Sequence, residues 1–191
     1  MQEPADTRPT EGPLRITPEM AAVAAVVVAA GAVAAWYLAS PATAAAVCAA
    51  GVFLAIAAID ACELRIPDAL SLPLGACGIA LSAAGVWPVN PADAAIGAAA
   101  LYLLGAGAGR LTGSRATLGR GDWKLLAASG AWLGLGTGAI AVAVAMLLAA
   151  VLLWTAAGAD RTTPVSVPFG TILGPVSAVV VVWTSLLALG T

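Results

Sequence analysis

Long runs of apolar residues, separated by short polar connections, dominate the chain. Runs of about 18 or more residues recur, and this length is typical of helices that cross a lipid bilayer. The runs are continuous and do not alternate between apolar and polar positions, which argues against a transmembrane barrel. We therefore expect an all-α, polytopic helical membrane protein with about seven apolar segments and six to seven spans. The expected segments are 20–38, 43–59, 67–87, 93–109, 122–134, 138–157 and 167–189.

Two of these segments have distinctive ends. Pro67 has a fixed φ that suits the first turn of a helix, so the third segment is expected to begin near it. The segment 122–134 is short for a span, and glycines crowd at positions 134, 136 and 138. This segment is expected either to be compressed against its neighbour or to lie partly at the membrane interface.

The first 40 residues allow two interpretations. Residues 1–19 contain four prolines and charges of both signs, so we expect a flexible tail there. The segment 20–38 is either an uncleaved anchor or a signal peptide that ends near Ser40. It is longer than a usual signal core and follows an acidic tail, which favours the anchor. The expected organisation is a tail, 1–19, and one membrane-embedded domain, 20–191.

The composition narrows the chemistry. Hydrophobic residues make up 61% of the chain and charged residues 9%, and the mean hydropathy is +0.99. The net charge of −2 gives no reason to expect nucleic-acid binding. Histidine, the commonest general base and metal ligand, is absent from the sequence. The cysteines Cys48, Cys62 and Cys77 form no Cys-x-x-Cys pair and are expected to be packing residues. We expect neither a metal nor a cofactor, so acid–base chemistry falls to carboxylates.

The basic residues are distributed on one side of the expected topology. If the seven segments all cross the membrane, the tail and every second connection hold all eight basic residues, and the other connections hold none. These residues are Arg8, Arg15, Arg65, Arg110, Arg115, Arg120, Lys124 and Arg161. Since basic residues accumulate on the cytoplasmic side, the N-terminus is expected in the cytoplasm and the C-terminus outside. Asp60 and Asp122 are then both expected at the cytoplasmic face.

The connection that follows Asp60 is short and carries three acids and one arginine. One interpretation is a solvated connector that keeps its charges in water. The other singles out Asp60, because it is the acid nearest the membrane end of its helix. Asp68 is either a part of this functional motif or an acid in the first turn that stabilises the helix dipole.

A second acid stands in Gly119-Arg120-Gly121-Asp122-Trp123-Lys124, at the start of an apolar helix. Ionisable groups at the edge of a membrane segment are costly and commonly functional. Gly119 and Gly121 are expected to permit a tight turn, with positive φ at Gly121, and a close approach of the backbone. Lys124 is expected either to orient a carboxylate or to extend its ammonium to the membrane interface.

These residues resemble the Gly-x-Gly-Asp motif of membrane aspartic peptidases, and specifically the type IV prepilin peptidases. Asp60 followed by Arg65-Ile66-Pro67-Asp68 is similar to the first catalytic motif of that family. Pro168-Phe169-Gly170-Thr171 is similar to its C-terminal Pro-Phe-Gly-Pro segment, although Thr171 stands where the family commonly has proline. The resemblance covers roughly residues 43–189.

The resemblance implies that Asp60 and Asp122 are catalytic and that positioning residues surround them. The positioning residues would be Gly119, Gly121, Lys124, Arg65, Pro67 and Asp68. Two facing carboxyls can share one proton and activate water without a metal. The implied substrate is a prepilin-like protein with a short basic leader and an apolar helix, cut at the inner membrane of a bacterium. The Cys-rich region of larger family members is missing, so N-methylation is not expected.

A competing hypothesis is a non-catalytic membrane scaffold or a transporter subunit. Asp60 and Asp122 would then join helices or line an ion pathway. Acids at a transport site are expected near the middle of the membrane, whereas these two stand at the ends of their segments. The sequence therefore favours the peptidase, and it leaves the oligomeric state open.

Overall fold

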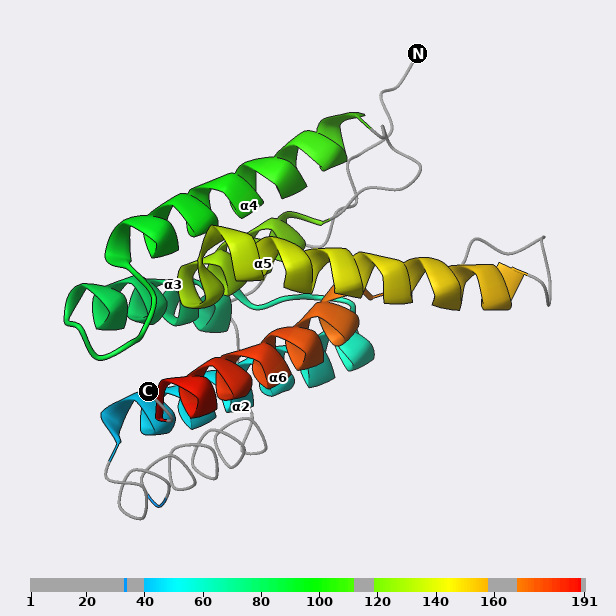
Figure 1. Cartoon of the computed structure of the whole chain (residues 1–191). Helices are drawn as coiled ribbons and strands as arrows, with labels where there is room; N and C mark the ends of the chain where they lie inside the picture. Colours follow the sequence, from blue (N-terminus) through cyan, green and yellow to red (C-terminus); the bar gives the residue numbers. More distant parts are fainter. Residues whose placement is uncertain (1–32, 34–39, 112–118, 158–167, 190–191) are drawn as a thin grey trace.

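A computed structural model describes Val33 and residues 40–111, 119–157 and 168–189. Over these residues the chain is all-helical, as the sequence predicts (Figure 1). The helices are α2 (Pro41–Glu63), α3 (Asp68–Ala83), α4 (Pro91–Leu111), α5 (Arg120–Ala157) and α6 (Phe169–Leu189). The expected tail and, apart from Val33, the segment 20–38 lie outside the described residues.

Four of the described helices have the length and composition needed to cross a membrane, namely α2, α4, α5 and α6. Their apolar stretches are Pro41–Glu63, Pro91–Ala108, Arg120–Thr155 and Phe169–Leu189. Helix α3 is apolar but shorter, since it ends at Ala83 and not near Trp87 as predicted. Residues 86–87 instead fold back, where both backbone N–H groups donate to the Leu81 carbonyl.

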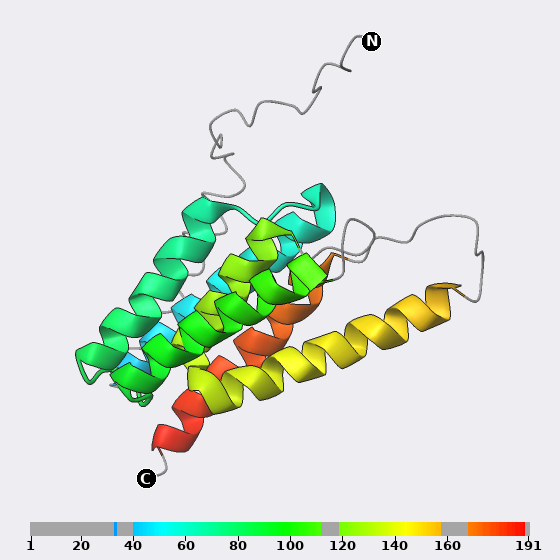
Figure 2. The ribbon, with the colours of Figure 1, turned by 90° about the horizontal axis from the view of Figure 1, so that it is seen from above.

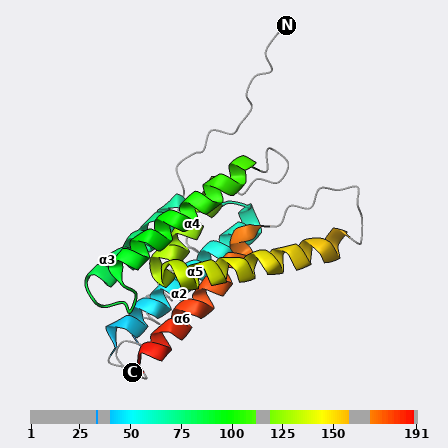
Figure 3. The same ribbon diagram turned by 45° about the horizontal axis from the view of Figure 1, so that its top comes forward.

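The first half of α5 lies at the centre of the bundle. Helix α5 contacts α3, α4 and α6, and α2 packs mainly along α6 (Figures 1 and 3). Seen from above in Figure 2, the second half of α5 diverges from the other helices. The central half is therefore the element that joins the α3–α4 side to the α2–α6 side.

Helix α5 is broken at Gly134. This residue has a φ of 71° and a ψ of −177°, values that interrupt helical geometry and that glycine adopts at little cost. The carboxylate of Asp93, at the start of α4, accepts a hydrogen bond from Leu135 N–H at 3.2 Å. The predicted segments 122–134 and 138–157 are thus two parts of one kinked helix, and Asp93 caps the start of the second part.

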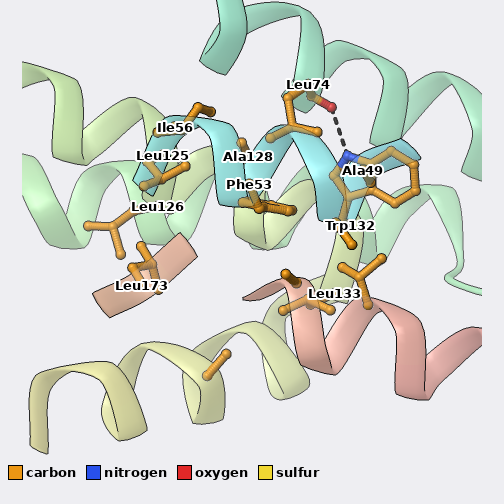
Figure 4. Close-up of a cluster of buried hydrophobic side chains, with 14 of the residues drawn as sticks. Ala49, Phe53, Ile56, Leu74, Leu125, Leu126, Ala128, Trp132, Leu133 and Leu173 are labelled. Atoms are coloured by element: carbon orange, nitrogen blue, oxygen red, sulfur yellow. Dashed lines mark hydrogen bonds between the residues drawn. The ribbon is translucent and has the colours of Figure 1, made fainter. Parts of the chain in front are cut away.

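The core is built from small and medium-sized apolar side chains contributed by several helices. Figure 4 shows it between α2, α3, α5 and α6. Phe53 and Ile56 of α2 are fully buried and meet the buried Leu125 of α5 and Leu173 of α6 in this cluster. Lipid tails are as apolar as the protein interior, so moving an apolar side chain from lipid into the bundle gains little free energy. Close packing is therefore what holds these helices together.

A pair of tryptophans fixes α3 and the following connection to α5. Trp87 Nε1 donates to the Trp132 carbonyl at 2.6 Å, and Trp132 Nε1 donates to the Leu74 carbonyl at 2.8 Å (Figure 4). The two rings meet edge to face, with centroids 5.0 Å apart. Both buried indole N–H groups are therefore satisfied, as buried tryptophans require.

Helices α4 and α5 touch backbone to backbone at Gly97 and Gly130. A Cβ on Gly97 would lie 2.7 Å from the Gly130 carbonyl oxygen, and a Cβ on Gly130 would overlap the Gly97 carbonyl. Small residues at such crossings let two helix axes come close together. This contact sets the separation of α4 from the central half of α5.

We predict that Gly97→Ala lowers the stability of the protein by about 1–3 kcal/mol, because the added methyl group overpacks this crossing. Gly107→Ala on the same helix is the control, since a Cβ there meets nothing within 4 Å. Removing a glycine from a helix at an open position gains up to about 1 kcal/mol. Thermal unfolding in detergent should therefore give midpoints that move in opposite directions. Equal stability of the two variants would contradict the proposed crossing.

Candidate active site

Three helix ends meet at one end of the bundle (Figure 2). Helix α2 ends there with Asp60 in its last turn, α5 begins there with Asp122 as its third residue, and α6 begins there at Phe169. A Cβ on Gly170 would meet both Asp60 and Ile66, and a Cβ on Gly121, the residue before Asp122, would also meet Ile66. Side chains 62 positions apart in the sequence are thus brought to a common site.

Asp60 is buried, with 4% of its surface exposed. Its Oδ2 atom accepts a hydrogen bond from the Thr171 N–H at 3.0 Å and lies 3.4 Å from the Thr171 hydroxyl. A Cβ on Gly170 would lie 2.9 Å from the same oxygen, so the start of α6 packs directly on the carboxylate. A buried carboxylate needs such donors, because an unpaired charge away from water is costly.

Asp122 is held by its own helix start. Its Oδ2 accepts the Gly119 N–H at 2.8 Å, while the Asp122 N–H donates to the Gly119 carbonyl at 3.0 Å. A side chain at the third helical position that reaches back to the residue before the helix is half of a capping box. The backbone N–H of Gly119 makes this bond, and a Cβ there would lie at an ordinary 3.4 Å from Oδ2.

Gly121 joins the two sequence motifs. A Cβ at this position would lie 2.8 Å from Ile66 Cβ and 3.3 Å from the Ile66 carbonyl oxygen. The expected close approach is therefore present, and its partner is the Arg65-Ile66-Pro67-Asp68 motif. The expected positive φ at Gly121 is wrong, because Gly121 lies in the first turn of α5 with an ordinary helical backbone.

Lys124 forms an ion pair with Asp68, in the first turn of α3. Both side chains keep contact with solvent, at 26% and 56% exposure. Of the two predicted roles, the structure favours orienting a carboxylate, but that carboxylate is Asp68. The pair ties the start of α3 to the start of α5.

The connection between α2 and α3 turns sharply beside the site. Leu64 caps α2 in a left-handed conformation, with a φ of 52°, and its N–H donates to the Asp60 carbonyl at 2.9 Å. Pro67 is buried and is the N-cap residue of α3, one position before the first turn in which the sequence predicted it. Arg65 is exposed between them. This turn carries Ile66 onto Gly121.

Thr171 is the site residue that the sequence did not single out for a role. Its motif was noted for similarity to the C-terminal segment of a family, and its identity only as a departure from proline. The hydroxyl and the backbone N–H both face Asp60, which is 111 positions away. The residue type, a donor at the start of an apolar helix, was the available signal.

Other acids and thiols lie away from the pair or serve other contacts. Asp93 caps the kink in α5 at the opposite end of α4 from Arg110. Cys62 and Cys77 are exposed and Cys48 is half-buried, so the expected packing role does not hold for the first two. Across residues 40–111, 119–157 and 168–189, no cluster of three or more metal-ligating side chains occurs.

Two carboxyl groups at one site can perform general acid–base chemistry on a bound water. Asp60 is the more enclosed of the two and Asp122 is half-buried. Both lie at helix ends, beside the exposed residues 61–65. The arrangement suits hydrolysis of a peptide bond at the edge of a membrane.

Comparison with known proteins gives a consistent result. The sequence profile of the type IV leader peptidase family matches residues 46–154. A prepilin leader peptidase/N-methyltransferase from Dickeya chrysanthemi is 45% identical over 109 residues, which are 54% of this chain and 38% of that protein. A protein of the same name from Xanthomonas campestris pv. campestris is 38% identical over 136 residues, 68% of this chain and 46% of the relative.

A third such protein, from Klebsiella pneumoniae, is 44% identical over 84 residues, 42% of this chain and 36% of the relative. The chain thus spans less than half the length of these curated relatives. No solved structure matches it. With its apolar helices, the likeness makes the chain a multi-pass protein of the bacterial inner membrane. Since the family profile matches more than half of the 191 residues, the chain belongs to the type IV leader peptidase family.

Proposed function

We propose that this chain is an aspartic endopeptidase that removes the leader peptide of prepilin-like proteins, with Asp60 and Asp122 as its catalytic pair. The observation that carries the proposal is the position of both carboxyls where α2, α5 and α6 come together. Asp60 there binds the start of α6, and Asp122 follows the contact of Gly121 with Ile66. Family membership supports the reaction class, and the relatives' names supply the substrate class.

The reaction uses the two acids as a unit. Two close carboxyls share one proton, because ionising both at short range is electrostatically costly. The ionised carboxyl takes a proton from water as the water oxygen attacks the peptide carbonyl carbon. The protonated carboxyl donates to the carbonyl oxygen, and a proton is then delivered to the departing amine. The pair titrates jointly, so protonation belongs to both residues.

The charge distribution supports a cytoplasmic site. Arg65, Arg120 and Lys124 lie at the same end of the bundle as the acids, and Arg110 lies in the last turn of α4, which also points there. Basic residues favour the cytoplasmic side. The proposed topology has the tail, 1–19, in the cytoplasm and a membrane-embedded catalytic domain over 20–191.

The substrate follows from the position of the site. A protein with one apolar helix and a short basic leader would place its helix in the bilayer and its leader beside the acids. The alternative of a transporter or scaffold fits less well, since both acids stand at helix ends and neither lies in the middle of a span. The bilayer itself is the other partner, through the apolar outer faces of the helices.

We predict that Asp60→Asn and Asp122→Asn each lower the cleavage rate by about a hundredfold or more, because an amide cannot exchange the proton. The assay is mass spectrometry of a prepilin incubated with each purified variant. Asp93→Asn is the matched control, since its amide oxygen still accepts the Leu135 N–H. An Asp93→Asn protein as inactive as Asp122→Asn would show that the wrong acids were chosen.

Gly121→Val should abolish cleavage while the protein remains folded and inserted, because the new side chain collides with Ile66 and displaces Asp122. Gly119→Ala is the control in the same turn, since its Cβ would make an ordinary contact and its N–H still reaches Asp122. Cleavage rates and detergent melting curves are measured for both. Wild-type activity in Gly121→Val would mean that the Ile66 contact does not hold the acid in place.

The 191-residue chain should cleave a prepilin without methylating the new N-terminus. Hydrolysis needs the two acids and water, whereas methyl transfer needs a site for a methyl donor. The connection 64–67 is too short to form one, and the stretch 110–121 has twelve residues without cysteine. The check is to add S-adenosylmethionine to the cleavage reaction and weigh the mature pilin. A methylated terminus produced by this chain would contradict the prediction.

A further inference from the structure

The start of α6 is directed at the carboxylate of Asp60. The first N–H groups of any helix have no partner within that helix. In α6, the third residue is Thr171, and its N–H donates to Asp60 Oδ2 at 3.0 Å. The approach is close because Gly170 has no side chain, and a Cβ there would lie 2.9 Å from Oδ2. The free N–H groups of α6 therefore serve the acid of α2.

The Thr171 hydroxyl has two acceptors within reach. Its Oγ1 lies 3.4 Å from Asp60 Oδ2 and 3.3 Å from the Ala57 carbonyl oxygen. A hydroxyl has one proton to donate and lone pairs that accept. It donates to Asp60 when that carboxyl is ionised. When Asp60 is protonated, the hydroxyl accepts from it and donates to Ala57. The hydroxyl therefore serves both states, whereas the backbone N–H can only donate and binds the carboxylate more strongly than the neutral acid.

The two acids are held differently. Asp122 receives its N–H from Gly119 and lies in the first turn of its own helix, where the dipole favours a negative charge, so its support is local. Asp60 stands at the C-terminal end of α2, where the helix dipole disfavours a negative charge, and at the N-terminal end of α6, where the dipole favours one. The support for charge on Asp60 thus comes from α6, through Thr171.

We propose that Thr171 is a positioning residue whose backbone N–H orients Asp60 and stabilises its ionised form. The inference rests on the proposed peptidase function. A carboxyl whose ionised form is stabilised in this way can take a proton from water.

The experiment compares pH–rate profiles of three variants with that of the unmodified chain. Thr171→Pro removes both donors, and a proline in the first turn of a helix is tolerated. Thr171→Val removes the hydroxyl and keeps the N–H, and Thr171→Ser keeps both. Each protein is purified in detergent, its melting curve is recorded, and kcat and KM for a prepilin are measured across pH.

Loss of the N–H destabilises the carboxylate, so the protonated form of Asp60 persists to higher pH. The acidic limb of the profile of Thr171→Pro should therefore move up, with kcat on that limb about tenfold lower. KM should stay within about twofold of wild type, and the plateau rate should fall less than the rate on the acidic limb. Thr171→Ser should follow the wild-type profile, and Thr171→Val should shift less than Thr171→Pro.

Several outcomes would overturn the inference. A Thr171→Pro protein that melts normally and keeps the wild-type profile would show that the N–H has no role in setting the charge of Asp60. An equal fall at every pH would indicate a purely structural effect. A shift in Thr171→Val as large as that in Thr171→Pro would assign the role to the hydroxyl. Cleavage by Asp60→Asn in the same assay would instead remove the proposed function itself.

Discussion

A buried carboxylate at the end of an apolar helix needs hydrogen-bond donors, and Asp60 obtains them from a helix 111 positions away. Its own helix offers none at that end, since the last turn of a helix presents carbonyl oxygens. Helix α6 must therefore return to α2 with its N-terminus beside Asp60, and the Thr171 bond is the outcome. The antiparallel packing of α2 on α6 along their lengths follows from this requirement as well as from apolar contact.

The first half of α5 transmits this arrangement to Asp122. Ser129 lies seven residues after Asp122, about two helical turns further into the bundle. Its hydroxyl meets that of Ser177 of α6 at 2.9 Å, and both residues are fully buried. The same α6 that binds Asp60 at its start thus holds the helix of Asp122 deeper in the core. Two further contacts link the start of α5 to the turn after Asp60. Gly121 packs against Ile66, and Lys124 forms an ion pair with Asp68.

Sequence patterns predicted the elements better than they predicted the contacts between them. The apolar segments and the glycines near 134 are features of local composition, so the helices and the break in α5 could be predicted from the sequence. Asp60 and Asp122 could be singled out from the sequence because each stands in a motif at a segment end, and their catalytic role stays a prediction. The contact partners of Gly121, Lys124 and Asp60 could not be predicted from the sequence. Periodicity gives the apolar face of a helix without naming the neighbour that covers it, and Thr171 carries no local mark of its distant acceptor.

The kink at Gly134 divides α5 into two halves whose side chains have different surroundings. Before it, Leu125, Leu126 and Trp132 are buried in the core shared with other helices, and the position of Asp122 depends on this packing. After it, Ala141, Val142 and Ala145 still contribute to the core. The helix then leaves the bundle, and Leu147 and Trp154 are 65% and 81% exposed. An exposed surface of this kind needs only to be apolar in order to lie in the hydrocarbon of a bilayer, and many sequences meet this requirement. Along one helix, close packing therefore constrains the side chains up to Ala145, and apolar character alone is required of residues 146–155.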